Sequence, residues 1–382
     1  MRVAVVGTGF ARQVHLPGYR MVDGIELVAV CDNRPGRARQ VAEEFSAVRW
    51  CENFADVLSM ADVDVIDICT PPTLHAPMSL DALSAGKAVI CEKPMSSGLA
   101  AAASMAAAAA SSGLPTAIHF QSRYLTPYRQ LRQVIADGCL GEIRLVLVTS
   151  FADYALDPRL EPHYATWASM ASEGGGFLAS AMAHSLDLTQ YLFGRVEPRA
   201  AMKHTALPRK PILAWDFIHD DPLSESSPTA GLADVTGDDT AVIQGRLAGG
   251  GVVVAAGSWA VKNGGGTRIE AYGADGTIIV DGSGAIAVAR GNGPLEPMPM
   301  PMPTPMPTPM PMPMPVPMPT PVPGAGSAPA GGRRDVPRLF AALAGDFMAA
   351  QRGEEPPADG WPFATFDDGL AVQRIIAAAG AD

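Results

Sequence analysis

The chain has 382 residues, of which 48% are hydrophobic and 18% are charged, so it is long enough for two domains and too apolar to be disordered. Its 28 Lys and Arg against 39 Asp and Glu give a net charge of −11, which disfavours a nucleic-acid partner. No charged-then-apolar leader precedes the first predicted strand, and no apolar run is long enough to span a bilayer. We therefore expect a cytoplasmic protein with no membrane partner.

The five cysteines are odd in number and show no Cys-x-x-Cys spacing. Three of them end predicted strands. We therefore expect buried, reduced cysteines rather than disulfides, and we predict no metal site.

The first 32 residues have the pattern of a dinucleotide-binding unit. An apolar run at 2–6 leads into Gly7-Thr8-Gly9-Phe10-Ala11, then into a helical segment that reaches residue 21, and a second apolar run at 26–31 ends in Asp32. Gly7 permits a tight turn, Gly9 lets the backbone approach a pyrophosphate, and Asp32 has the spacing of an acid that binds the adenosine ribose hydroxyls.

Two arginines modify this pattern. Arg12 stands where a third small residue is expected, which affects the local packing of helix on sheet rather than the fold. Asp32 opposes a 2′-phosphate, whereas Arg34 could tolerate one, so NAD is the first choice of cofactor and NADP the second.

The alternation of strand and helix continues to about residue 120. Strands are predicted near 48–50, 63–69, 88–91 and 116–120. Helices are predicted near 36–44, 55–60 and 99–111, and a further helix follows the strand at 63–69 and ends at residue 85. This order predicts a doubly wound parallel sheet of the Rossmann type over residues 1–120.

Residues 121–296 have a different pattern of predicted helices and strands. Helices are predicted near 128–137 and 177–193, and strands at 142–151, 196–204, 240–247, 251–259, 267–272 and 277–280. We expect an α/β domain with a large, mainly antiparallel, open-faced sheet. Its free face could cover substrate or pair with a second subunit, giving a homodimer or homotetramer.

In the segment 297–323, proline occupies every odd position. Such a repeat predicts a semi-rigid polyproline II rod, and residues 297–332 are interpreted as a low-complexity insert and flexible linker rather than a binding element. Residues 333–382 are predicted to form helices that pack back on the domains.

Glu92-Lys93-Pro94 directly follows the apolar strand at 88–91. Ligands of open α/β sheets bind outside the carboxyl ends of the strands, so Lys93 is a candidate for proton transfer or for holding a substrate oxygen. A lysine taken alone is usually a solvated surface charge.

Several motifs occur through the chain in a fixed order. They are Gly7-Thr8-Gly9-Phe10 with His15-Leu16-Pro17, Asp32, Thr70-Pro71-Pro72 with His75, Glu92-Lys93-Pro94, Arg123-Tyr124, Gly174-Gly175-Gly176, His184 with Asp187, and Thr365 to Leu370. Their resemblance, over nearly the whole chain, is to the glucose-fructose oxidoreductase, inositol dehydrogenase and MocA family. It implies bound NAD or NADP, oxidation or reduction of a sugar, cyclitol or related polyol, and a cis peptide bond between Lys93 and Pro94.

The expected site residues follow from these motifs. The catalytic pair is Lys93 and His184, since a secondary alcohol needs a base when it is oxidised and its ketone needs an acid when it is reduced. The expected cofactor-binding residues are Gly7, Gly9, Phe10, Ala11, Asp32, Arg34, Thr70, Pro71, His75, Glu92, Lys93 and Gln121. The expected substrate-binding residues are Lys93, Arg123, Trp167, Ser180 and His184, with Tyr124 and His163 nearby in the sequence.

Ser180 departs from the family pattern, because the position one helical turn before the catalytic His usually carries Asp. A serine can form a hydrogen bond to substrate but supplies no charge. Two other functions therefore stay open: a non-catalytic dinucleotide-binding sensor, and a redox-neutral enzyme that oxidises a sugar transiently to allow elimination or glycoside cleavage.

Overall fold

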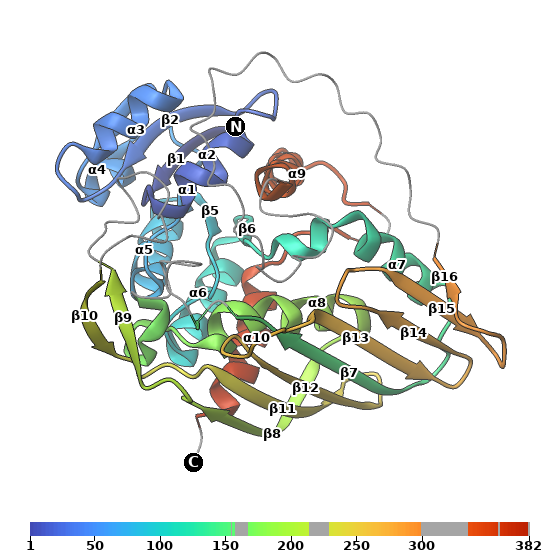
Figure 1. Ribbon diagram of the computed structural model, residues 1–382. Helices are drawn as coiled ribbons and strands as arrows, with labels where there is room; N and C mark the ends of the chain where they lie inside the picture. Colours follow the sequence, from blue (N-terminus) through green and yellow to red (C-terminus); the bar gives the residue numbers. More distant parts are fainter. Residues whose placement is uncertain (154, 157–166, 214–228, 299–334, 358–359, 381–382) are drawn as a thin grey trace. The chain divides into compact units, whose positions relative to one another are not determined.

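The structure is a computed structural model that describes residues 1–153, 155–156, 167–213, 229–298, 335–357 and 360–380 (Figure 1). The chain divides into two compact units, the first formed by Met1–Leu125 with Gly331–Ala377 and the second by Thr126–Ala330 with Ala378–Asp382. His163 and most of the proline-rich repeat lie outside the described residues.

The first unit contains a six-stranded parallel sheet in the order β3-β2-β1-β4-β5-β6. The strands are β1 Arg2–Val6, β2 Glu26–Cys31, β3 Arg49–Cys51, β4 Val65–Ile68, β5 Ala88–Cys91 and β6 Thr116–Ile118. The strand order reverses between β1 and β4, which is where doubly wound sheets bind their ligands. The predicted Rossmann-type sheet is confirmed.

Helices connect these strands along the chain. They are α1 Gly9–Gln13, α2 His15–Tyr19, α3 Arg37–Phe45, α4 Phe54–Ser59, α5 Pro72–Ser84 and α6 Leu99–Ser112. The helical segment predicted up to residue 21 is divided into α1 and α2, because the backbone leaves helical geometry at Val14. Pro17 has no N–H to donate to a preceding turn, so it is tolerated only near the start of the new helix α2.

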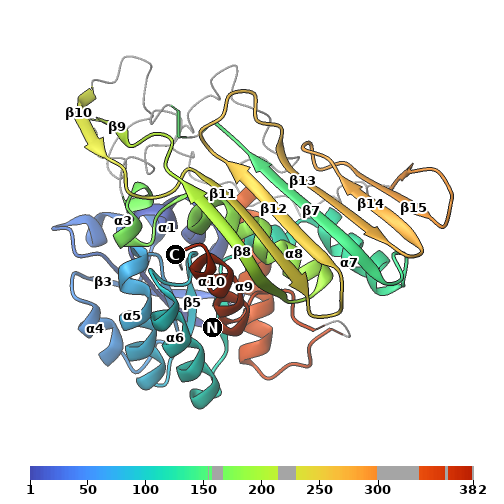
Figure 2. The same ribbon diagram turned by 90° about the horizontal axis from the view of Figure 1, so that it is seen from below.

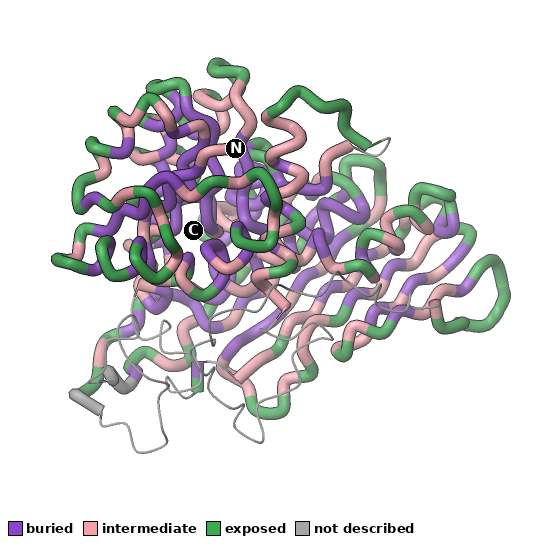
Figure 3. Tube along the Cα trace, turned by 90° about the horizontal axis from the view of Figure 1, so that it is seen from above, coloured by how far each residue is buried: buried purple, intermediate pink, exposed green. Residues whose placement is uncertain are grey.

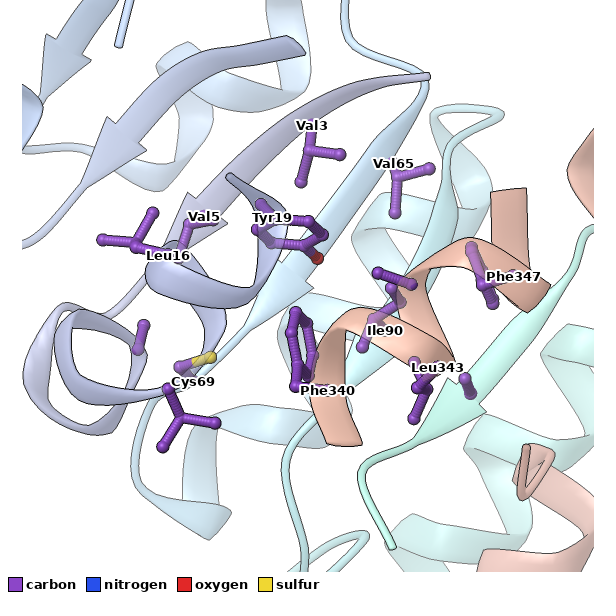
Figure 4. Close-up of a cluster of buried hydrophobic side chains, with 14 of the residues drawn as sticks. Val3, Val5, Leu16, Tyr19, Val65, Cys69, Ile90, Phe340, Leu343 and Phe347 are labelled. Atoms are coloured by element: carbon purple, nitrogen blue, oxygen red, sulfur yellow. The ribbon is translucent and has the colours of Figure 1, made fainter. Parts of the chain in front are cut away.

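The core of the first unit is completed by the C-terminal helix α9, Val336–Gln351. Figure 4 shows Phe340, Leu343 and Phe347 of this helix facing side chains of the sheet and of α2, including Ile90 and Leu16. All five side chains are buried. The helix α10, Phe366–Ala378, follows, and Ala364 just before it forms an isolated β-bridge with Ile118.

The second unit contains an eight-stranded sheet in the order β16-β15-β14-β13-β7-β12-β11-β8 (Figure 2). The strands are β7 Ile143–Phe151, β8 Val196–His204, β11 Thr240–Leu247, β12 Val252–Ser258, β13 Gly266–Gly273, β14 Gly276–Val280, β15 Ile286–Arg290 and β16 Glu296–Pro297. Every pair is antiparallel except β12 with β7, so the predicted mainly antiparallel sheet is confirmed.

One face of this sheet packs against α7, Thr126–Ala136, and α8, Ala183–Phe193 (Figure 2). Burial alternates along the strands, as Figure 3 shows by colour, because successive side chains point to opposite faces. Ala241, Ile243, Val253 and Ala255 are buried, whereas their neighbours Val252, Val254 and Val242 are exposed or half-buried.

The structure adds strands that the sequence patterns did not predict. β9 Arg209–Leu213 and β10 Thr229–Asp234 form a separate two-stranded sheet, and β15 and β16 extend the large one. No helix among the described residues is both long and apolar enough to cross a bilayer. All five cysteines are buried and free, as predicted.

Candidate active site

The turn after β1 has the geometry that a dinucleotide requires. Gly7 has φ +88°, and a Cβ there would lie 2.6 Å from the carbonyl oxygen of Cys69, so no other residue fits. A Cβ at Gly9 would meet no protein atom within 4 Å, which leaves the space beside this backbone open for a ligand. Phe10 is partly exposed next to this space and Ala11 is fully buried, so the turn fits a bound dinucleotide.

The carboxylate of Asp32, at the end of β2, is tied to this turn. Thr8 donates to Oδ2 from its backbone N–H at 2.9 Å and from its hydroxyl at 2.6 Å. Burial alone would raise the pKa of Asp32, but the hydrogen bonds from Arg34 and Thr8 outweigh it and hold the pKa well below its usual range. Asp32 is therefore an anion at neutral pH.

The loop after β4 is joined to the loop after β5 by a histidine. The ring nitrogens of His75 lie 2.9 Å from the carbonyl oxygen of Pro94 and 2.8 Å from that of Thr70. Burial lowers the pKa of this imidazole. His75 therefore ties the backbone of these two loops together at the carboxyl edge of the sheet, where Thr70 and Pro71 follow β4.

Behind Lys93 lies a buried network of ionisable side chains. His15 Nδ1 lies 2.8 Å from Asp67 Oδ2, and His15 Nε2 lies 2.8 Å from Glu92 Oε1. His119 Nδ1 lies 2.6 Å from the same Glu92 oxygen, and the Tyr19 hydroxyl donates to Asp67 at 2.9 Å.

The charges of this network can be assigned from its contacts. Burial lowers the pKa of His15, but the negative charges and hydrogen bonds of Asp67 and Glu92 outweigh it and raise the pKa to about 9. Burial lowers the pKa of His119, and the charge and hydrogen bond of Glu92 oppose this only in part. Burial raises the pKa of Glu92, but His119 and His15 more than offset this and hold it well below its usual range.

His15, Glu92 and His119 also carry atom types that ligate metals, and their donor atoms lie close together. Those atoms already hydrogen-bond to one another, and we describe them as an ionisable network. The sequence motifs include His15 but do not connect it to Asp67 or Glu92. The available signal was Asp67 itself, a carboxylate inside the otherwise apolar strand β4.

Lys93 follows Glu92 at the carboxyl end of β5. Its peptide bond to Pro94 is cis, as the family resemblance implied, and its backbone N–H donates to Glu92 Oε2 at 3.1 Å. The side chain is half-buried. Burial lowers the pKa of the Lys93 amine, and the charge of Glu92 only partly opposes this. Such an amine exchanges its proton more readily than a surface lysine.

The turn Gln121–Tyr124 follows β6 and contains the expected site residues Gln121 and Arg123, with Tyr124 beside them. Gln121 is half-buried, whereas Arg123 is buried and lies 3.4 Å from Asp368 Oδ2 at the start of α10. The hydroxyl of Tyr124 donates to Asp346 of α9 at 3.0 Å. Arg123 and Tyr124 thus join the C-terminal helices to the rest of the first unit, and these contacts favour a structural role for both.

In the second unit, the glycine run lies before an irregular helix. Gly176 has φ +115°, and a Cβ there would lie 2.3 Å from Asp238 Oδ1, so the close approach needs glycine. Asp238 Oδ2 accepts the backbone N–H of Leu178 at 2.9 Å, which satisfies a donor at the start of this segment. Trp167 lies in a short 3-10 turn at Trp167–Ser169 and is half-buried.

The segment Leu178–Met182 is a π-helical turn, and α8 begins directly after it. Ser180 lies within the π-turn and is buried, and His184 lies in the first turn of α8 and is half-buried. Single π-turns inside helices are frequent at functional sites, since they change which side chains a helix presents. Ser180 and His184 belong to the second unit, whereas Lys93 belongs to the first.

Two family models match the chain. Residues 1–120 match the family model for the oxidoreductase family with an NAD-binding Rossmann fold, and residues 128–279 match the GFO/IDH/MocA C-terminal domain. D-glucoside 3-dehydrogenase of Escherichia coli (strain K12) is 31% identical over 54% of this chain and 57% of its own length. Myo-inositol 2-dehydrogenase of Thermotoga maritima is 24% identical over 74% of this chain and 75% of its own.

Among solved structures, a levoglucosan dehydrogenase in complex with NADH and levoglucosan superposes with a TM-score of 0.75. That likeness covers 100% of this chain and 97% of the other at 21% sequence identity, and it shows the shared fold. With both family models matched in chain order and an NAD-binding turn of fitting geometry, the resemblance is confirmed, and the chain belongs to the GFO/IDH/MocA family of NAD-binding oxidoreductases.

Proposed function

We propose that this chain transfers a hydride between NAD and a secondary alcohol or ketone carbon of a sugar, cyclitol or related polyol. Relatives named for dehydrogenation of a glucoside and of myo-inositol support this substrate class. The observation that carries the proposal is Lys93, a half-buried amine with a lowered pKa at the ligand edge of an NAD-binding sheet.

NAD, when bound, supplies or accepts the hydride, and the protein handles the proton. We assign Lys93 to hold the reacting oxygen, because its amine lies at the carboxyl end of β5 and loses its proton more readily than a surface lysine. We assign His184 as the acid or base, since imidazole titrates in the range that this step needs. The hydroxyl of Ser180 takes the place of a carboxylate and offers substrate a hydrogen bond without charge.

The test uses variants of these two residues with matched surface controls. Lys93→Ala and His184→Ala are each expected to bind NADH as the wild type does and to lose at least about a hundredfold in kcat/KM. Lys203→Ala and His204→Ala remove the same side-chain types from exposed positions in β8 and are expected to keep full activity. An active Lys93→Ala/His184→Ala double variant would refute the assignment.

The same assay separates the alternative functions. A panel of polyols and 3-keto sugars is incubated with the wild type, and cofactor absorbance and product mass are followed together. Product with an equal change in NADH supports the dehydrogenase, and product without any net change selects the redox-neutral enzyme. Cofactor binding with no product from any member of the panel selects the sensor.

We also propose that the open face of the large sheet binds a second copy of the chain. The outward side chains of its central strands include Leu145, Leu147, Val242, Val252 and Val254, all exposed or half-buried. An apolar face of this extent is typical of an interface. A dimer or tetramer in sedimentation analysis that becomes a monomer in Val252→Arg would support this, and a monomeric wild type would refute it.

The five free cysteines support a reducing, cytoplasmic location.

A further inference from the structure

Two of the five cysteines lie directly opposite each other in the parallel sheet of the first unit. Cys31 ends β2 and Cys51 ends β3, and the register of these two strands pairs one residue with the other. Paired residues of neighbouring strands present their side chains to the same face of a sheet, so the two thiols lie side by side. The negative charge of Asp56 in α4 acts on both thiols, which agrees with one shared face.

The two thiols differ in how readily they lose a proton. A hydrogen bond from the Cys31 thiol lowers the pKa of Cys51 and outweighs burial, which raises it. The same hydrogen bond, together with burial, raises the pKa of Cys31. A thiolate is the form of cysteine that attacks an oxidant, so Cys51 is the nucleophile of the pair and Cys31 lies in position to resolve it.

The other three cysteines, all of which the structure describes, lack this combination. Burial raises the pKa of Cys69, of Cys91 and of Cys139. Cys91 of β5 pairs with Ile68 of β4, so Cys69 is one residue out of register with it. Successive side chains of a strand point to opposite faces, which places Cys69 and Cys91 less favourably for a bond between their sulfurs.

The backbone at Cys31 and Cys51 supports the cofactor site. The carbonyl oxygen of Cys31 accepts the N–H of Gly7 at 2.8 Å, and that of Cys51 accepts the N–H of Asp32 at 3.2 Å. Neighbouring strands lie about 4.8 Å apart, whereas the two Cβ atoms of a disulfide lie about 3.8 Å apart. A bond between the two sulfurs would therefore draw the strand ends together by roughly 1 Å and move the turn and the carboxylate that they hold.

We propose that Cys31 and Cys51 form a reversible disulfide when the chain meets a peroxide, and that this cross-link weakens the binding of the nicotinamide dinucleotide. A peroxide is small enough for Cys51, which is only 7% exposed. Disulfides of cytosolic proteins are typically transient and sense redox conditions, so the reduced pair of this structure is the resting state. The inference goes beyond the proposed function, because it requires the NAD-binding turn and no sugar chemistry.

Two steps account for the atoms and electrons. The Cys51 thiolate attacks one oxygen of hydrogen peroxide, the O–O bond breaks, and the leaving hydroxide takes a proton to become water, which leaves a sulfenic acid on Cys51. The sulfur of Cys31 then attacks the sulfur of Cys51, the S–O bond breaks, and the thiol proton leaves with the hydroxide as a second water. Each sulfur is oxidised by one electron, and the peroxide is reduced to two waters.

The cross-link is detected by mass in the full chain. The reduced protein is treated with hydrogen peroxide, the remaining thiols are blocked, and the chain is cleaved after glutamate without reductant. This cleavage places Cys31 in residues 27–43, Cys51 in residues 45–52, and both Cys69 and Cys91 in residues 53–92. We expect one linked pair of peptides, 27–43 with 45–52, that dithiothreitol separates.

NADH binding shows whether the cross-link reaches the cofactor site. NADH is titrated before and after peroxide treatment and followed by fluorescence. The Kd of the wild type is expected to rise by about tenfold or more, as for the loss of one or two hydrogen bonds, and dithiothreitol should restore it. Cys51→Ser should have the same Kd before and after treatment. Cys139→Ser removes a buried cysteine from the second unit and should respond as the wild type does.

Three results would overturn the inference. They are a wild type in which peroxide produces no link between Cys31 and Cys51, a linked wild type with an unchanged Kd for NADH, and a Cys51→Ser variant that loses NADH binding after peroxide as the wild type does. The first two need only the wild type, so they hold even where the variant does not fold. A protein that binds NADH but converts no sugar would refute the proposed function and leave this inference standing.

Discussion

His15 Nε2 lies 2.8 Å from Glu92 Oε1, and the other ring nitrogen of His15 lies 2.8 Å from Asp67. The imidazole is wholly buried and stacks on Phe340 with ring centroids 3.8 Å apart. A protonated His15 is thus the cation that two buried carboxylates share. It stabilises Glu92 as an anion directly before the proposed catalytic lysine.

We expect His15→Gln to lower the free energy of unfolding by about 3–5 kcal/mol, because it leaves two buried carboxylates without their cation. Urea unfolding followed by circular dichroism measures the effect. The double variant His15→Gln/Asp67→Asn removes one charge of each sign and should be more stable than His15→Gln alone. As a control, Arg199→Ala breaks a surface ion pair with Glu197 and should change stability little, since both side chains are more than 60% exposed. A His15→Gln variant as stable as the Arg199→Ala control would contradict the charges assigned to His15 and its two carboxylates.

The same residue predicts how stability depends on pH. The pKa of His15 is raised from 6.5 to about 9 in the folded chain, so the folded state holds this proton more tightly. Its contribution is fully present below the unfolded pKa of 6.5 and is lost as pH rises through about 9. The shift corresponds to about 3 kcal/mol. We expect the stability difference between wild type and His15→Gln to shrink by this order between about pH 6 and about pH 10. A difference that stays constant over this range would show that His15 is neutral.

Much of the fold could be predicted from the sequence because its patterns are local. Strands β5, β8 and β11 have the predicted bounds. An apolar run marks β5, and an alternation of buried residues marks β11. β9 and β10 were missed because their sequences, RKPIL and TAGLAD, have neither pattern. β9 and β10 are strands because they pair with each other, and this pairing is a tertiary effect that a local pattern does not reveal.

The candidate site was predictable where a residue follows a strand and not where distant segments meet. The positions of Gly7, Asp32 and Lys93 follow from the order of strand and turn. The contact of Arg123 with Asp368 joins residues 245 positions apart, and a basic residue in a loop gives no sign of such a partner. The prediction that Arg123 binds substrate was therefore made without this contact.

The C-terminal helix α9 is expected to be required for the folding of the first unit. Phe340 is fully buried and contacts the rings of His15, Tyr19 and His119. Figure 4 shows it beside Tyr19. Phe340→Ala should cost about 3–5 kcal/mol, because it leaves a cavity beside the buried charges. Phe151→Ala, at a position 36% exposed, removes the same side chain and should cost much less. Thermal unfolding of the two variants side by side measures the difference, and equal losses would refute the importance of this packing.

Two glycines at the α2 and α9 region should respond to alanine with opposite signs. A Cβ at Gly18 would lie 2.7 Å from Phe340 Cδ1 and 2.8 Å from the carbonyl oxygen of Pro337, and the backbone oxygen cannot move without moving α9. Gly18→Ala should therefore destabilise the chain by at least about 1–3 kcal/mol. At Gly345, within α9, a Cβ would meet nothing within 4 Å, so Gly345→Ala should stabilise it by about 0.5–1 kcal/mol through the helix propensity of alanine. Urea unfolding midpoints that move in the same direction for both variants would contradict the close packing of α2 on α9, because only that packing distinguishes the two positions.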